Sequence, residues 1–219
     1  MKRIGFLLCL WFLDVSAVPA RVMIIRHAEK DDDERKVKFG KWNIAEALPI
    51  SAQGWIRAYA FVPFFTMDTT IIADWGGNMI KGLFAVKPGP DYESVREIQT
   101  LTPLSEKMNL PINADYALGD MDQMVNYILK ASEYNGGLVI ISYEHLHIPK
   151  LVSAFDKNNS KVTQWPHDVF DWIVYLIFDP QTSQVTQCEI KLQKLLYGDA
   201  SVVQSATTKT SWYDRLKFW

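Results

Sequence analysis

Cysteine is scarce in this chain of 219 residues, where Cys9 and Cys188 are the only two. Cys9 lies in an N-terminal segment that we expect to be removed, which would leave one cysteine and no intramolecular disulfide. Cys188 lies in the alternating stretch VTQCEIKL, a pattern typical of a strand. We therefore expect Cys188 to be a small core residue and not a nucleophile.

The chain also lacks a strong excess of charge of one sign. Its 23 Lys and Arg residues nearly balance 25 Asp and Glu residues, giving a formal net charge of −2. This balance lacks the excess of basic residues that is typical of nucleic-acid binding, so we expect no nucleic-acid partner. No internal repeat is visible. The 48% hydrophobic content predicts one globular domain with a substantial core.

The apolar run at residues 4–13 is too short to span a bilayer comfortably. Basic residues precede it, and the small residues Ala17 and Ala20 follow it. This is the order of a secretory signal peptide. We predict a signal peptide over residues 1–20, cleaved after Ala17 or Ala20, and a secreted or periplasmic protein with no stable membrane span. The alternative is that the run forms a hydrophobic first strand or helix of the domain.

Downstream, short apolar runs alternate with segments of helical spacing. This alternation predicts a three-layer α/β sandwich on a mostly parallel central sheet. The expected strands are 21–25, 69–74, 82–86 and 138–142, followed by a strand pair at 168–179 and 185–196 with a turn at 180–183. The expected helices are 51–65, 91–110 (beginning at Asp91 or Ser94, with a division at Pro103 left open), 119–132 and 144–155.

Polar residues follow two of the expected parallel strands at the point where each ends. Arg26 and His27 follow the run VMII, and His145 follows the run LVIIS closely. Ligands of such sheets bind beyond the carboxyl ends of the strands, so the two histidines could meet there. An imidazole can attack phosphorus when one ring nitrogen is held by a hydrogen bond and the other is free. A neighbouring guanidinium suits phosphate oxygens, so this edge predicts a phosphoryl site.

Five segments carry a family resemblance, and they occur in one order along the chain. They are RHAEK (26–30), LPISAQGWIRA (48–58), SVREIQTLTPL (94–104), LVIISYEHLHIP (138–149), and WPHDVFDWIVYLIFD followed by KLLYGD. Together they resemble the histidine phosphatase superfamily, which has the phosphoglycerate mutase-like fold. The match is to a bacterial branch with a Glu-His motif at its second histidine, where Tyr143 stands in place of a frequent Trp. The resemblance covers a domain at 21–199 and leaves a C-terminal tail, 200–219, unassigned.

The resemblance implies a role for several residues of the site. His27 would be the nucleophile and form a phosphohistidine, while Arg26 and Arg96 would bind phosphate oxygens. His145 would hold the transferring group and stabilise charge in the transition state. No metal and no cofactor is implied. The implied partner is a phosphorylated small-molecule substrate that the sequence does not name.

The resemblance leaves the proton donor to the leaving group open. Glu144 is favoured because it adjoins His145, and a carboxyl group must reach the leaving oxygen to act as an acid. Asp120 and Glu29 are the other candidates. We therefore expect an exported phosphomonoesterase acting through His27. The alternative is a non-catalytic phosphate-binding or regulatory protein that retains the pocket; a mutase is disfavoured by export.

The remaining polar residues have plainer interpretations. We expect Arg57 on an exposed or half-exposed helix face, paired with a carboxylate, and His147 as a packing or capping group that points away from the site. His167 is expected in a loop, and residues 31–33 in a solvated acidic loop. A metal site on His145 and His147 is disfavoured because a helix is expected to begin there.

Overall fold

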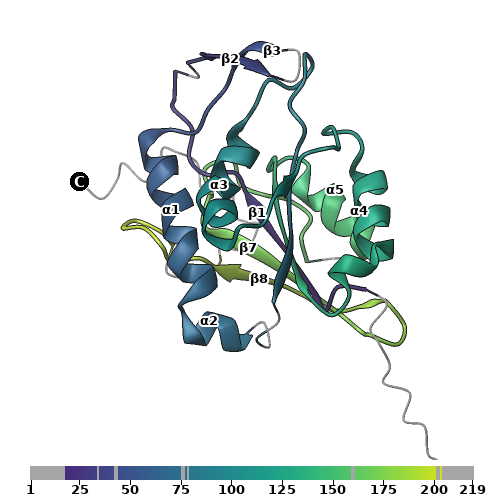
Figure 1. The fold of residues 1–219 in the computed structure, drawn as a ribbon. Helices are drawn as coiled ribbons and strands as arrows, with labels where there is room; N and C mark the ends of the chain where they lie inside the picture. The colour runs from purple at the N-terminus through teal and green to yellow at the C-terminus, as the bar shows by residue number, and fades with distance from the viewer. Residues whose placement is uncertain are drawn as a thin grey trace, which may run out of the picture.

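The computed structural model describes residues 18–33, 35–41, 44–74, 77, 79–158, 161–200 and 203 (Figure 1). Most of the expected signal peptide and most of the C-terminal tail lie outside these residues. The strands are β1 (Arg21–Arg26), β2 (Val37–Lys41), β3 (Ile44–Ala47), β4 (Ile80–Ala85), β5 (Ile112–Asn113), β6 (Leu138–Tyr143), β7 (Trp172–Phe178) and β8 (Val185–Leu192). The helices are α1 (Ala52–Thr66), α2 (Thr69–Asp74), α3 (Arg96–Met108), α4 (Met121–Lys130), a 3₁₀ turn η1 (Ser132–Tyr134) and α5 (Ile148–Phe155).

The central sheet has six strands in the order β5-β4-β6-β1-β7-β8. The neighbours from β5 to β1 pair in parallel, whereas β7 runs antiparallel to both β1 and β8. The sheet is therefore mostly parallel, as predicted. Strand β1 is hydrogen-bonded along both edges, so the backbone that leads into His27 is firmly held.

Helices cover both faces of this sheet, which gives the predicted three layers (Figure 1). Alternate residues of β1 point to opposite faces, as the pleat of a strand requires. Val22 and Ile24 join a core with helices α4 and α5, and Met23 and Ile25 join a core with helices α1 and α3. All four side chains are fully buried.

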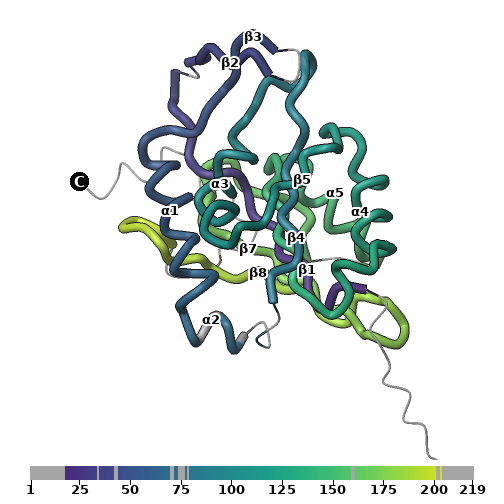
Figure 2. Tube along the Cα trace, viewed as in Figure 1, coloured from purple at the N-terminus to yellow at the C-terminus, as the bar shows by residue number. Residues whose placement is uncertain are grey.

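A separate two-stranded hairpin, β2–β3, lies away from the main sheet, beyond the carboxyl end of β1 (Figure 2). The segment after the hairpin returns to the domain through a bridge between Leu48 and Ser94. Helix α1 then begins behind Ser51, whose hydroxyl accepts the Gly54 N–H at 3.1 Å, as the sequence predicts.

The expected strand at 69–74 and the expected helix start at Asp91 or Ser94 are wrong, and the possible division at Pro103 is not present. Residues 69–74 form helix α2, not a strand, and the Ile72 N–H donates to the Asp68 carbonyl at 2.8 Å. A segment of six residues with a short apolar centre does not distinguish strand from helix by periodicity alone. Helix α3 begins at Arg96, later than Asp91 or Ser94, and continues through Pro103 without division. Leu101 and Leu104, fully buried on either side of Pro103, hold that helix against the sheet.

The residues just before β1 are already part of the folded domain. Val18 is buried in the α4–α5 core, and its carbonyl accepts the Gly136 N–H at 2.9 Å. The Ala20 carbonyl accepts the Phe178 N–H at 3.1 Å. Cleavage after Ala17 would keep both contacts, whereas cleavage after Ala20 would remove them.

Candidate active site

His27 lies at the end of β1 with its ring almost completely buried, at 3% exposure. Its backbone N–H donates to the Tyr143 carbonyl at 3.2 Å, which ties the end of β1 to β6. Its Nδ1 lies 2.7 Å from the Ala28 carbonyl oxygen. Because a carbonyl only accepts, Nδ1 carries the proton, and the neutral ring has its lone pair on Nε2. This is the tautomer that a nucleophilic imidazole needs.

The electrostatic surroundings of His27 keep its ring neutral. Burial, followed by the positive charge of Arg26, lowers the pKa of His27 to about 3. The ring therefore stays unprotonated through the neutral and moderately acidic range. An unprotonated imidazole close to cations is suited to attack an anionic group that those cations bind.

Arg26 is fully buried, and only part of its hydrogen-bonding capacity is used. Its Nη1 donates to the carbonyl oxygens of His167 and, at 3.1 Å, Val169. The guanidinium carbon lies 3.7 Å from the centre of the Phe170 ring. Its Nε and Nη2 are buried without a hydrogen-bond partner among the described residues. Burial lowers the pKa of Arg26 to about 10, so the group remains charged at neutral pH.

Arg96 supplies a second guanidinium from the first residue of α3. The side chain is buried, and its Nε donates to the Pro49 carbonyl at 3.1 Å. The charge of Arg96 acts on both Arg26 and His27, lowering the pKa of each after the larger effect of burial. Two buried guanidinium groups that repel each other would be stabilised by a bound anion.

A second strand end completes the site from β6, where Glu144 joins two histidines. Glu144 Oε1 lies 2.6 Å from His145 Nδ1, and Glu144 Oε2 lies 2.7 Å from His147 Nδ1. Both ring nitrogens of His145 are buried without a hydrogen-bond partner among the described residues, so its contact with Glu144 is an ion-pair contact and its Nε2 is available to a ligand. Burial alone would raise the pKa of Glu144, but the contacts with His145 and His147 lower it to about 2.

These side chains surround one cavity of about 450 Å³. Its walls come from the ends of β1 and β6, the loop between β4 and α3, and Leu48 after the hairpin. The lining residues are Arg26, His27, Lys30, Leu48, Pro90, Asp91, Tyr92, Glu93, Ser94, Arg96, Leu118, Glu144, His145, Leu146 and His147. The structure thus brings together all five residues predicted for the site: Arg26, His27, Arg96, Glu144 and His145.

The other two candidate proton donors lie outside the cavity lining. Asp120 precedes α4 and accepts the Ala117 N–H at 3.2 Å. Glu29 accepts two hydrogen bonds from Arg57 Nε, at 2.9 and 3.0 Å, and one from Nη2 at 2.7 Å. Arg57 is 2% exposed, so the expectation of an exposed or half-exposed position is wrong, although its pairing with a carboxylate is confirmed.

Tight packing against α1 fixes the loop that follows His27. The Ser51 N–H donates to the Glu29 carbonyl at 2.8 Å. A Cβ at Gly54 would collide with that same carbonyl oxygen, so glycine is needed at this position. On the other side of the loop, the Ala28 N–H donates to the Thr100 hydroxyl at 2.8 Å. Gly54 of LPISAQGWIRA and Thr100 of SVREIQTLTPL therefore have structural roles beside the nucleophile.

Several cavity residues were not singled out by sequence reasoning. Lys30, Asp91, Tyr92 and Glu93 lie in loops, where spacing gives no orientation. His147 was expected to point away, because helical spacing was assumed from residue 144. Helix α5 begins only at Ile148, so the turn that precedes it brings His147 to the cavity wall. His167 lies in a loop, as predicted, and Cys188 is buried, as predicted.

The described residues contain no group of three or more His, Cys, Asp or Glu side chains placed to hold a metal ion. Within the same part of the chain, no helix has the length and apolar character that crossing a membrane requires.

No protein-family model matches the sequence, and no curated protein matches it. Solved structures with a similar fold include a candidate phosphohistidine phosphatase SixA from Agrobacterium tumefaciens, at 13% identity over 78% of this chain and 98% of that one, with a TM-score of 0.47. Phosphoglycerate mutase from Bacillus anthracis is similar at 10% identity over 78% and 92%, with a TM-score of 0.45. A mycobacterial glucosyl-3-phosphoglycerate phosphatase in complex with inorganic phosphate is similar at 13% identity over 79% and 95%, with a TM-score of 0.44.

Proposed function

We propose that this protein is a phosphomonoesterase that forms a phosphohistidine on His27. The observation that carries the proposal is the state of that ring: Nδ1 is held by the Ala28 carbonyl, and burial and Arg26 keep the ring neutral. Nε2 therefore carries a lone pair at the cavity wall. The unpartnered Nε and Nη2 of Arg26 are suited to donate hydrogen bonds to the oxygens of a bound phosphoryl group.

The first chemical step transfers the phosphoryl group to His27. A phosphate monoester carries close to two negative charges near neutral pH, and Arg26 and Arg96 would hold its oxygens. His27 Nε2 attacks phosphorus, a nitrogen–phosphorus bond forms, and the bond between phosphorus and the ester oxygen breaks. The buried His145 Nε2 would donate to the oxygens that gain charge in the transition state.

The second step returns the enzyme to its starting state. Water attacks the phosphohistidine, the nitrogen–phosphorus bond breaks, and inorganic phosphate leaves.

Glu144 is poorly suited to protonate the ester leaving group in the first step, because a carboxyl group with a pKa of about 2 is ionised at the pH of turnover. Its carboxylate instead fixes the orientation of two imidazole rings.

The test is the hydrolysis of 4-nitrophenyl phosphate by the purified protein in the presence of a chelator. His27→Ala is the matched variant, and acid quenching of the wild type with a ³²P-labelled substrate traps the intermediate. We expect chelator-resistant turnover and an acid-labile phosphoprotein in the wild type, with neither in His27→Ala. Turnover that survives the substitution would refute the proposal.

The alternative of a non-catalytic phosphate-binding protein draws on one observation, the ionised state of the favoured donor Glu144. A binding protein would show saturable association of inorganic phosphate in calorimetry, weakened by Arg96→Ala, without turnover of any monoester. A catalyst would turn over at least a substrate with a good leaving group, so the two functions are separable.

We further propose that the protein is exported. The basic start, apolar run and small residues of the N-terminus support this proposal. The contacts of Val18 and Ala20 favour cleavage after Ala17 over cleavage after Ala20. N-terminal sequencing of the protein recovered from the medium or the periplasm tests both points, and an intact Met1 would contradict them.

A further inference from the structure

Glu144 connects two imidazole rings that differ in their exposure. Its Oε1 lies at Nδ1 of His145, whose side chain is 8% exposed, and its Oε2 lies at Nδ1 of His147, whose side chain is 33% exposed. Both histidines line the cavity. One ring therefore lies inside the site and the other at its opening, and one carboxylate orients both.

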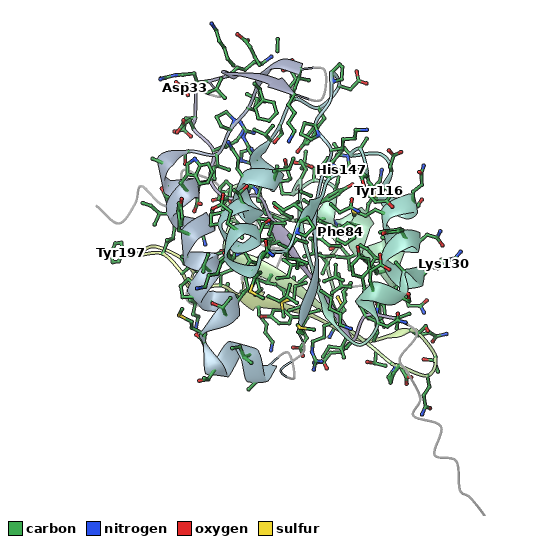
Figure 3. The ribbon with its side chains drawn as sticks, in the orientation of Figure 1. Asp33, Phe84, Tyr116, Lys130, His147 and Tyr197 are labelled. Atoms are coloured by element: carbon green, nitrogen blue, oxygen red, sulfur yellow. The ribbon has the colours of Figure 1, made fainter. Side chains whose placement is uncertain are left out.

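The position of His147 is fixed by its backbone as well as by its ring. Its N–H donates to the Glu144 carbonyl at 3.0 Å and to Glu144 Oε2 at 3.2 Å. In Figure 3, His147 lies between Phe84 in the core and the β2–β3 hairpin. A substrate whose phosphoryl group is bound by the fully buried Arg26 would extend its leaving group toward the more exposed part of the lining, to which His147 belongs.

We propose that His147 is the general acid that protonates the leaving group, an inference that rests on the phosphatase activity proposed above. As His27 Nε2 bonds to phosphorus and the ester bond breaks, the proton on His147 Nε2 passes to the ester oxygen, which leaves as an alcohol. The His147 ring is then neutral. His147, whose side chain is 33% exposed, regains its proton from solvent before the next turnover, and the protons of the attacking water leave with inorganic phosphate.

The chemistry of the pair Glu144–His147 suits this role. The ionised carboxylate accepts the Nδ1 proton at 2.7 Å, so the transferable proton is the one on Nε2. Among the described residues, the carboxyl groups that line the cavity besides Glu144 are Asp91 and Glu93. Glu93 is paired with Lys36, which makes Asp91 the principal rival donor.

The experiment compares two substrates that differ in their need for an acid. 4-Nitrophenyl phosphate has a leaving group that departs without protonation, whereas glycerol phosphate releases an alkoxide unless it is protonated. The variants are His147→Gln, His147→Asn and Asp91→Asn. Lys150→Gln is the control, because Lys150 is exposed in the first turn of α5 and does not line the cavity.

For both His147 variants we expect kcat for glycerol phosphate to fall by about 10²-fold, with at most a severalfold change for 4-nitrophenyl phosphate. KM and the amount of trapped phosphoprotein from the aryl substrate should stay near wild-type values, and Lys150→Gln should behave as the wild type. An equal loss on both substrates would show a positioning role through Glu144 and overturn the assignment. A selective loss in Asp91→Asn alone would also overturn it. A wild type inactive on both substrates would refute the phosphatase proposal itself.

Discussion

Replacement of Arg57 by alanine tests whether a buried ion cluster next to the site stabilises the whole domain. Arg57 donates to Glu29, to Asp199 at 2.7 and 3.1 Å, and to Gln193 at 2.8 Å. The Arg57 side chain is 2% exposed, the Glu29 side chain 11% and the Asp199 side chain 8%. Removal of the guanidinium would leave two carboxylates with little access to solvent and no cation between them.

The expected loss follows from this burial. Removing one partner of a buried ion pair costs about 3–5 kcal/mol, because the remaining charge is uncompensated. For a domain of about 200 residues each kcal/mol lowers Tm by about 2–4 °C, so Arg57→Ala should lower Tm by about 6–20 °C. The matched control is Arg35→Ala, since Arg35 is 78% exposed and pairs with Asp33 at 2.9 Å. An exposed pair contributes no more than about 1 kcal/mol.

The dependence on pH gives a second check. Burial alone would raise the pKa of Asp199, but hydrogen bonds from Arg57 lower it below its usual value. A lowered pKa in the folded state means that the stabilisation is complete above the unfolded-state pKa of about 3.9 and is lost as the pH falls below it. Thermal unfolding of wild type and Arg57→Ala should therefore differ most near pH 7 and converge toward pH 3. A loss no larger than that of Arg35→Ala, or a difference that does not shrink in acid, would refute this reasoning.

Three further predictions concern the site, each measured by steady-state kinetics. Glu144→Gln should lower kcat by about 10²-fold or more on every monoester, because an amide can donate where the imidazole Nδ1–H needs an acceptor; an effect confined to poor leaving groups would contradict this. Arg26→Lys should lower kcat/KM by about 10²-fold although the charge is kept, because a lysine has no second nitrogen to replace the unpartnered Nε and Nη2. An unchanged kcat/KM would show that two-point binding of phosphate by Arg26 is not part of the mechanism. The low pKa of His27 predicts that, as the pH falls, protonation of His27 reduces kcat/KM only near pH 3. A loss on acidification centred near pH 6.5, measured with a substrate that does not itself titrate there, would show an exposed imidazole.

The sequence was most informative where general rules of sheets apply. Buried runs followed by Arg26–His27 and by Glu144–His145 predicted that both groups meet at one edge, since parallel strands present their carboxyl ends together. The structure places them around one cavity, as expected. Helix α1 was predictable from its Ser cap, β8 from its alternating pattern, and the β7–β8 pair from the turn between the two strands.

Other features depended on contacts between distant parts of the chain. The burial of Arg57 depends on Asp199, 142 positions away, which no local pattern reveals. The place of His147 depends on where α5 begins, and helix boundaries are the least certain part of a sequence-based prediction. The run at 69–74 is too short for its periodicity to be diagnostic, and Pro103 is tolerated because the residues beside it are buried.

The two halves of the cavity wall differ in how firmly the fold holds them. His27 ends a strand paired on both sides, whereas residues 86–95 form a loop held by the Leu48–Ser94 bridge, a short turn between Gly89 and Tyr92, and a few side-chain contacts. Under the proposed function, exchange of this loop should therefore alter substrate preference while leaving the residues at the ends of β1 and β6 unchanged. In the proposed mechanism, hydrolysis of the phosphohistidine no longer involves the leaving group. The rate of this hydrolysis should stay constant across loop variants whose KM values differ, and single-turnover kinetics on such a series would measure that rate.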